Sequence, residues 1–103
     1  MRDLVLAKQF EEVIFAVKNL DGNINDKIPY KKLSHTTFVG IPLTSTLKEG
    51  SYFFQFNYKQ NKTSTALFNQ IRVFDIRRAD YFSGRINTNT WENLNKALKE
   101  FLL

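Results

Sequence analysis

The length of 103 residues and the composition, 43% hydrophobic and 24% charged, leave room for one domain with one core and exclude a disordered tail, a collagen-like rod and a multidomain enzyme. The chain has no cysteine and one histidine, which excludes disulfides, thiolate nucleophiles and Cys- or His-rich metal sites, so we expect no metal and no other cofactor. Lysine and arginine total 15 against 10 aspartates and glutamates, and the formal charge of +5 favours a polyanionic partner.

We expect neither a membrane-spanning segment nor an export signal. No apolar stretch approaches the roughly 20 residues that a spanning helix requires, and charged residues interrupt the apolar positions near the start. We therefore expect a cytoplasmic protein without a membrane partner. Residues 36–103 hold nine basic and five acidic side chains, so a nucleic-acid surface is expected in this later part.

Residues 1–20 are predicted to form an amphipathic helix. The apolar positions at helical spacing are Leu4, Ala7, Phe10, Ile14 and Val17. The β-branched residues near the end of this segment would also suit a strand. Residues 21–35 are dense in turn-forming residues and are predicted to be a loop.

Residues 36–88 are predicted to form the core of a small antiparallel β-barrel, because short β-rich runs alternate with turn signals. Thr37–Leu43 is one such strand. Pro42 has no N–H to donate, so this strand should lie at an edge or end about there. Ser51–Tyr58 alternates aromatic with other residues and has one aromatic face. Ser64–Phe74 is partly apolar on both faces, which predicts the central strand.

Residues 89–103 are predicted to form the C-terminal helix. Asn89 can cap it, with Glu92 at the third helical position. The apolar stripe consists of Trp91, Leu94, Ala97, Leu98 and Phe101. The chain is therefore expected to be a single α+β domain over residues 1–103.

Two polar clusters stand at the ends of apolar runs and are candidates for chemistry. Thr44-Ser45-Thr46 follows the first predicted strand, where the alternative is a hydroxyl-rich turn that satisfies its own backbone. In Asn69-Gln70-Ile71-Arg72, the amide of Gln70 and the guanidinium of Arg72 share a face of the predicted strand. The alternative there is a polar stripe, or an ion pair of Arg72 with Asp75 or Asp80.

Taken together and in order, these motifs resemble the MazF/PemK family of type II toxin–antitoxin toxins. The resemblance covers about Lys31 to Leu103. The motifs that carry it are Phe38-Val39-Gly40-Ile41-Pro42-Leu43-Thr44-Ser45, Lys48-Glu49-Gly50, the run from Ser64 to Asp75, Arg78 and Gly84-Arg85-Ile86.

The resemblance implies an SH3-like antiparallel β-barrel with a C-terminal helix, a homodimer, and a metal-independent endoribonuclease that acts on single-stranded RNA and is held inactive by a cognate antitoxin. It implies a catalytic hydroxyl at Thr44, with Ser45 beside it, and Arg72 as a partner for the phosphate. The side chains expected to contact RNA are Asn69, Gln70, Arg77, Arg78, Arg85 and Lys48. We expect Thr44, Ser45 and Arg72 to converge on one basic hollow.

Residues 1–30 depart from the family's pattern. Family members begin with a strand, a glycine-rich loop and an Arg-Pro pair whose arginine is a main catalytic residue, whereas here Pro29 follows Ile28. Either a helix replaces the first strands, which we favour, or another arginine has taken over the role. The first explanation implies reduced or absent activity. The alternative function is a non-catalytic module that binds RNA or an antitoxin.

Overall fold

The computed structural model describes residues 13–19, 22–59 and 62–103. Seven strands form one antiparallel sheet, and an α-helix follows them. The strands are β1 (Val13–Lys18), β2 (Ile24–Lys32), β3 (Thr37–Thr44), β4 (Phe53–Lys59), β5 (Lys62–Leu67), β6 (Arg72–Asp75) and β7 (Ala79–Arg85). The helix α2 spans Thr88–Leu102, and two short 3-10 turns, η2 (Phe68–Gln70) and η3 (Ile76–Arg78), flank β6.

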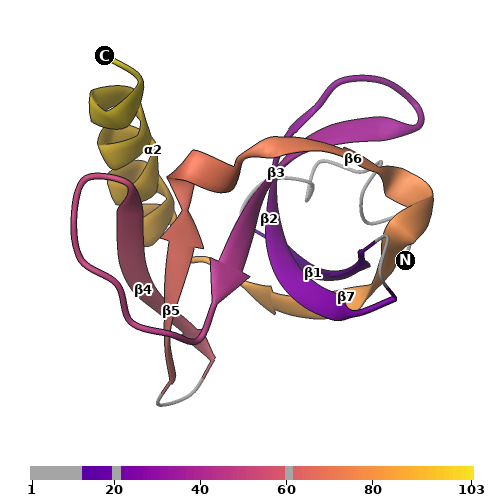
Figure 1. Cartoon of the computed structure of the whole chain (residues 1–103), viewed down its shortest axis with the longest axis horizontal. Helices are drawn as coiled ribbons and strands as arrows, with labels where there is room; N and C mark the ends of the chain where they lie inside the picture. Colours follow the sequence, from indigo (N-terminus) through magenta and orange to yellow (C-terminus); the bar gives the residue numbers. More distant parts are fainter. Residues whose placement is uncertain (1–12, 20–21, 60–61) are drawn as a thin grey trace.

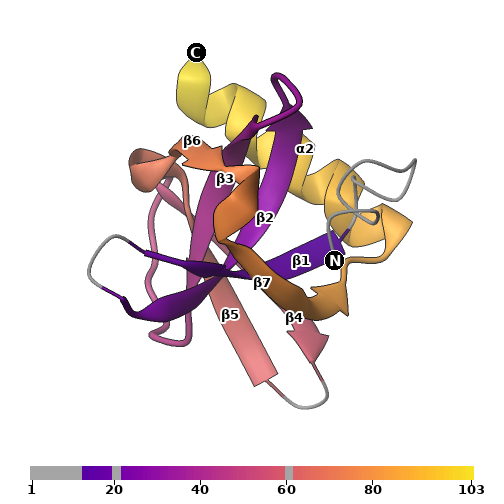
Figure 2. The same cartoon turned by 90° about the vertical axis from the view of Figure 1, so that its right-hand side faces the viewer.

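The sheet has the strand order β4-β5-β3-β2-β1-β7, and β6 pairs with β3 beside this path. Strands β1, β2, β3, β6 and β7 curl round one side of the molecule, while the β4–β5 hairpin and α2 occupy the other (Figures 1 and 2). The expected antiparallel sheet with a C-terminal helix is therefore confirmed.

Two apolar clusters hold the sheet in this shape. The larger cluster lies between the β4–β5 hairpin, α2 and the central strands, and includes Ile28, Phe56 and Leu94. The smaller cluster, which includes Phe15 and Phe74, lies within the curl. Strand β1 contributes Ile14 to the first cluster and Phe15 to the second, so its two faces are both buried.

The predicted N-terminal helix is wrong for residues 13–18, which form β1; residues 1–12 lie outside the described residues. Residues 13–17 are all buried. A strand whose faces are both covered has no polar alternation, so its apolar run can match a helical spacing by chance. The β-branched residues of this segment favour the extended form that the tertiary contacts select.

The predicted loop over residues 21–35 is also wrong, because β2 spans Ile24–Lys32 and pairs with both β1 and β3. Pro29 is accommodated where the register with β3 shifts between Pro29 and Lys31. Such irregularities are where a strand tolerates a residue without an N–H. The explanation in which a helix replaces the family's first strands therefore fails, since β1 and β2 are present.

Strand β3 is central rather than at an edge. It pairs with β2 on one side, and on the other with β6 through residues 37–40 and with β5 through residues 43 and 44. Pro42 falls between these two partner strands, where no ladder bond to its nitrogen is needed. The predicted strand Ser64–Phe74 is divided by η2 into β5 and β6, which pair with different stretches of β3.

The aromatic strand and the C-terminal helix are confirmed. On β4, the Phe56 ring lies 5.9 Å from Phe54 and 5.6 Å from Tyr58, centroid to centroid, against the larger cluster. The N-cap of α2 is Asn87 rather than Asn89, because the Asn87 side chain accepts a 2.7 Å hydrogen bond from the Thr90 N–H. No helix in the described ranges is both long and apolar enough to cross a membrane.

Candidate functional site

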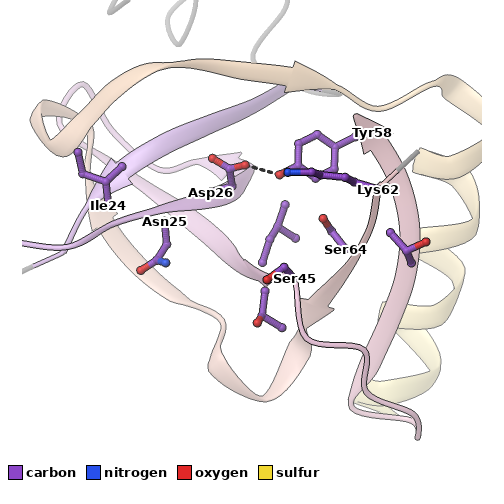
Figure 3. A pocket seen from close by; sticks show the side chains of 10 residues that line it. Ile24, Asn25, Asp26, Ser45, Tyr58, Lys62 and Ser64 are labelled. Carbon is purple, nitrogen blue, oxygen red and sulfur yellow. Dashed lines mark hydrogen bonds between the residues drawn. The ribbon is translucent and has the colours of Figure 1, made fainter. Parts of the chain in front are cut away.

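A hollow of about 450 Å³ lies between the start of β2, the end of β3, the end of β4 and the start of β5 (Figure 3). We call it the β3-end hollow. Its lining residues are Ile24, Asn25 and Asp26 of β2, Leu43 and Thr44 of β3 with the following Ser45, Tyr58 of β4, and Lys62, Thr63 and Ser64 of β5. The predicted hydroxyl pair, Thr44 and Ser45, thus lies in a concave site that both polar and apolar side chains line.

The hydroxyl of Thr44 is fixed by the pairing of β3 with β5. Thr44 is the last residue of β3 and is paired with Thr65. Its Oγ1 accepts a 3.2 Å hydrogen bond from the Thr46 N–H, and the Thr65 hydroxyl donates to the Thr46 carbonyl at 3.0 Å. The Thr44 and Thr65 hydroxyls therefore stabilise this turn through its backbone, as in the alternative interpretation of a hydroxyl-rich turn. Because Thr44 Oγ1 acts as an acceptor there, its own proton can be donated to a ligand.

A hydrogen-bonded cluster joins three strands at one wall of the hollow. Asp26 Oδ2 accepts hydrogen bonds from the Tyr58 hydroxyl and, at 2.9 Å, from Ser83 Oγ (Figure 3 shows the Tyr58 contact). Burial, followed by the hydrogen bond to Asp26 and its negative charge, raises the pKa of Tyr58 well above its usual range. Tyr58 therefore remains a protonated donor. A Cβ on Gly84 of β7 would lie 2.8 Å from Tyr58 Cδ2, so glycine permits this approach.

Lys62, at the start of β5, is the one cation among the described residues that line this hollow. The sequence predicts a loop at Asp26 and indicates no role for Asp26 or Lys62. Local sequence carries no signal for either residue. Their meeting depends on the β4–β5 hairpin and on the pairing of β3 with both β2 and β5.

Arg72 does not join Thr44 and Ser45. It pairs with Gly40, four positions before Thr44 on β3, which corresponds to about 13 Å along the strand. Arg72 lines a second hollow of about 550 Å³ with Lys18 and Arg78, which we call the basic hollow. The expected convergence on one hollow is therefore not met.

Comparison with known proteins identifies the family. The family model described as "PemK-like, MazF-like toxin of type II toxin-antitoxin system" matches residues 24–102. The chain belongs to this toxin family. The match begins at residue 24, the start of β2, whereas the resemblance seen in the sequence begins at about Lys31.

A solved structure has the same fold as this PemK/MazF-family chain. It is the Mycobacterium tuberculosis toxin MazF-mt6, with a TM-score of 0.74 and 13% sequence identity over 87% of this chain and 95% of that one. No curated protein sequence matches the chain.

The other residues predicted to contact RNA in this PemK/MazF-family chain are dispersed. Asn69 and Gln70 are exposed in η2, so Gln70 does not share a strand with Arg72. Arg85 lies over the Phe82 ring at 5.8 Å. Lys48 lies over the Phe53 ring at 5.6 Å. None of these four residues lines the β3-end hollow or the basic hollow, and their roles stay predictions.

Arg77 is bound to Asp75, one of the two partners considered for Arg72. Two side-chain nitrogens of Arg77 reach the carboxylate, Nη2 at 2.6 Å and Nε at 3.0 Å, and its backbone N–H donates at 2.8 Å. These hydrogen bonds and the adjacent positive charge lower the pKa of Asp75 to about 2. The Asp75 charge is thus compensated at neutral pH.

The residue before Pro29 is Ile28, not the arginine expected from the family resemblance. Ile28 is fully buried in the larger apolar cluster, so it offers no polar group to the hollow. Its neighbour Lys27 is also buried, with Nζ 5.2 Å from the Phe74 ring centroid in the curl. Within the described ranges, no group of three His, Asp or Glu side chains is arranged to hold a metal ion.

Proposed function

We propose that this chain is a toxin that cleaves single-stranded RNA without a metal ion, acts in the cytoplasm as a homodimer with an SH3-like barrel, and is inhibited by a cognate antitoxin. One observation carries the proposal: the hydroxyls of Thr44 and Ser45 and the ammonium of Lys62 line one hollow in a chain of the PemK/MazF family.

The proposed reaction uses a nucleophile that the substrate supplies. The 2′-oxygen of one nucleotide forms a bond to the adjacent phosphorus as the bond from phosphorus to the 5′-oxygen breaks. The products are a 2′,3′-cyclic phosphate and a 5′-hydroxyl. We assign the 2′-hydroxyl proton to the Asp26 carboxylate, and the leaving 5′-oxygen takes its proton from water. Only RNA has the attacking group, which accounts for selectivity against DNA.

Charge accumulates on the non-bridging phosphate oxygens during this displacement, and fixed donors aimed at that charge lower the barrier. Lys62 supplies a charge-assisted donor and Thr44 a neutral one, both at the rim of the same hollow. Tyr58 and Ser83 hold the Asp26 carboxylate in place. Tyr58 is therefore a positioning residue in this mechanism.

A second candidate function is a non-catalytic module that binds RNA or an antitoxin segment. The buried Ile28 favours it, because the family's catalytic arginine is replaced by a side chain that cannot contact a phosphate. Lys62 of β5 brings a cation to the hollow in place of that arginine. For this reason we rank the ribonuclease first.

Incubating the purified chain with single-stranded RNA in EDTA tests the proposal. We expect fragments that end in 2′,3′-cyclic phosphate. Thr44→Ala and Lys62→Gln should each slow cleavage by about 100-fold, the usual loss when one charge-stabilising donor is removed. Ser51→Ala and Lys96→Gln are matched controls, because both residues are exposed and line no described hollow. RNA binding without fragments would instead select the non-catalytic module.

A further inference from the structure

The basic hollow gathers positively charged side chains that can bind a phosphate. Lys18 comes from the end of β1, Arg72 from β6 and Arg78 from η3, so three separate elements bring their cations to one concavity. Its carboxylate, Asp75, is already bound by Arg77. The guanidinium of Arg72 lies 5.0 Å from the Phe74 ring centroid, and a stacked guanidinium keeps donors available for a phosphate.

A third hollow adjoins both the basic hollow and the β3-end hollow, because it shares lining residues with each. This middle hollow, of about 350 Å³, shares Lys18 and Arg78 with the basic hollow and Ile24 with the β3-end hollow. Because neighbouring hollows share lining residues, we call the three together the track. Exposed apolar side chains lie along it, with Ile24 44% and Val73 54% exposed. The track thus offers cationic groups and exposed apolar surface that a base or ribose can cover, together with the carboxylate of Asp80 in the middle hollow.

We propose that this track binds a single RNA strand, and that Lys18, Arg72 and Arg78 form an anchoring site for its phosphodiester backbone beyond the reaction hollow. RNA as the ligand rests on the proposed function. A phosphodiester chain fits because it repeats its charge along its length, so one strand can satisfy Lys62 in one hollow and the three cations in the other. Arg72 then acts in substrate anchoring, separated from the scissile phosphate.

Binding can be measured apart from cleavage with a fluorescein-labelled, 2′-O-methylated single strand of about 12 nucleotides, within the range that small nucleic-acid-binding folds cover. Fluorescence anisotropy over a salt series gives the affinity and its salt dependence. Arg72→Ala and Arg78→Ala should each weaken binding about threefold. Each should also reduce the slope of log K against log[salt] by about 0.7, the value for one phosphate contact to a single strand. Lys96→Ala, an equal charge change on α2, should alter neither quantity.

Cleavage kinetics give a second readout. Arg72→Ala should lower kcat/KM for the unmodified strand more than kcat/KM for a dinucleotide, because a dinucleotide is too short to occupy both hollows. Equal losses on both substrates would overturn the proposal, since Arg72 would then belong to the reaction itself. Binding by Arg72→Ala and Arg78→Ala that matches Lys96→Ala would also overturn it. If the chain cleaves no RNA but binds with the expected losses, the proposed function fails and the anchoring site stands.

Discussion

Replacing Tyr58 by phenylalanine isolates the hydrogen-bonded cluster that joins β4, β2 and β7. The substitution keeps the ring that packs against Phe56 and Gly84 and removes only the hydroxyl that donates to Asp26. The Asp26 carboxylate then keeps its 2.9 Å hydrogen bond from Ser83 but loses the hydrogen bond that the partly buried Tyr58 hydroxyl donates in the wild type.

The expected loss of stability follows from the kind of bond removed. Hydrogen bonds to charged groups contribute about 1.5–3 kcal/mol, and the partial exposure of this site puts the loss near 1.5 kcal/mol. For a domain of 103 residues this corresponds to a fall in melting temperature of about 7 °C. Thermal and urea unfolding followed by circular dichroism measure both values. Tyr81→Phe is the matched control, because Tyr81 is 52% exposed and makes no hydrogen bond to a described residue; we expect a change below about 0.5 kcal/mol.

The pH dependence gives the sharper test. The folded-state pKa of Tyr58 is raised, so the folded state retains this proton when the unfolded chain releases it near its ordinary pKa of about 10. The stabilising contribution of Tyr58 is therefore complete below pH of about 10 and is lost as the pH rises above it. The difference in unfolding free energy between wild type and Tyr58→Phe should shrink from pH 10 upward. A difference that is absent at neutral pH, or constant to high pH, would refute the reasoning.

The remaining predictions concern the core and one ion pair. Gly40→Ala should destabilise the fold by about 1–3 kcal/mol in urea unfolding, because its Cβ would lie 2.6 Å from Phe74 Cδ2; an unchanged midpoint would contradict the packing. Leu94→Ala should lower the free energy of unfolding by about 2–5 kcal/mol in the same measurement, since Leu94 of α2 is fully buried. By NMR titration, Asp75 should keep a pKa of about 2 in the wild type and move towards its usual value in Arg77→Gln. The contribution of this pair to stability should be present above the ordinary aspartate pKa and be lost as the pH falls towards 2; a titration unaffected by Arg77→Gln would assign the shift to another cause.

The sequence alone determined the parts of this protein whose signal is local. The aromatic alternation of β4 and the apolar stripe of α2 each repeat within a few residues, so the strand and the helix could be predicted and are confirmed. The order of short motifs between Phe38 and Ile86 was sufficient to indicate the toxin family, which the family match confirms. The hydroxyl pair Thr44-Ser45 could also be singled out, because it follows a recognisable strand, and its catalytic role stays a prediction.

Only the tertiary structure decided the N-terminal strands and the composition of the hollows. Strand β1 is buried on both faces, so no polar alternation marks it, and β2 is recognisable only as a partner between β1 and β3. Lys62 lines the same hollow as Thr44, and Arg72 lines another. The reason is that the 3-10 turn η2 divides the apolar run into two strands, β5 and β6, which pair with different ends of β3. Which strands pair with one another depends on contacts between residues that are distant in the sequence, and the local pattern of these segments did not show their partners.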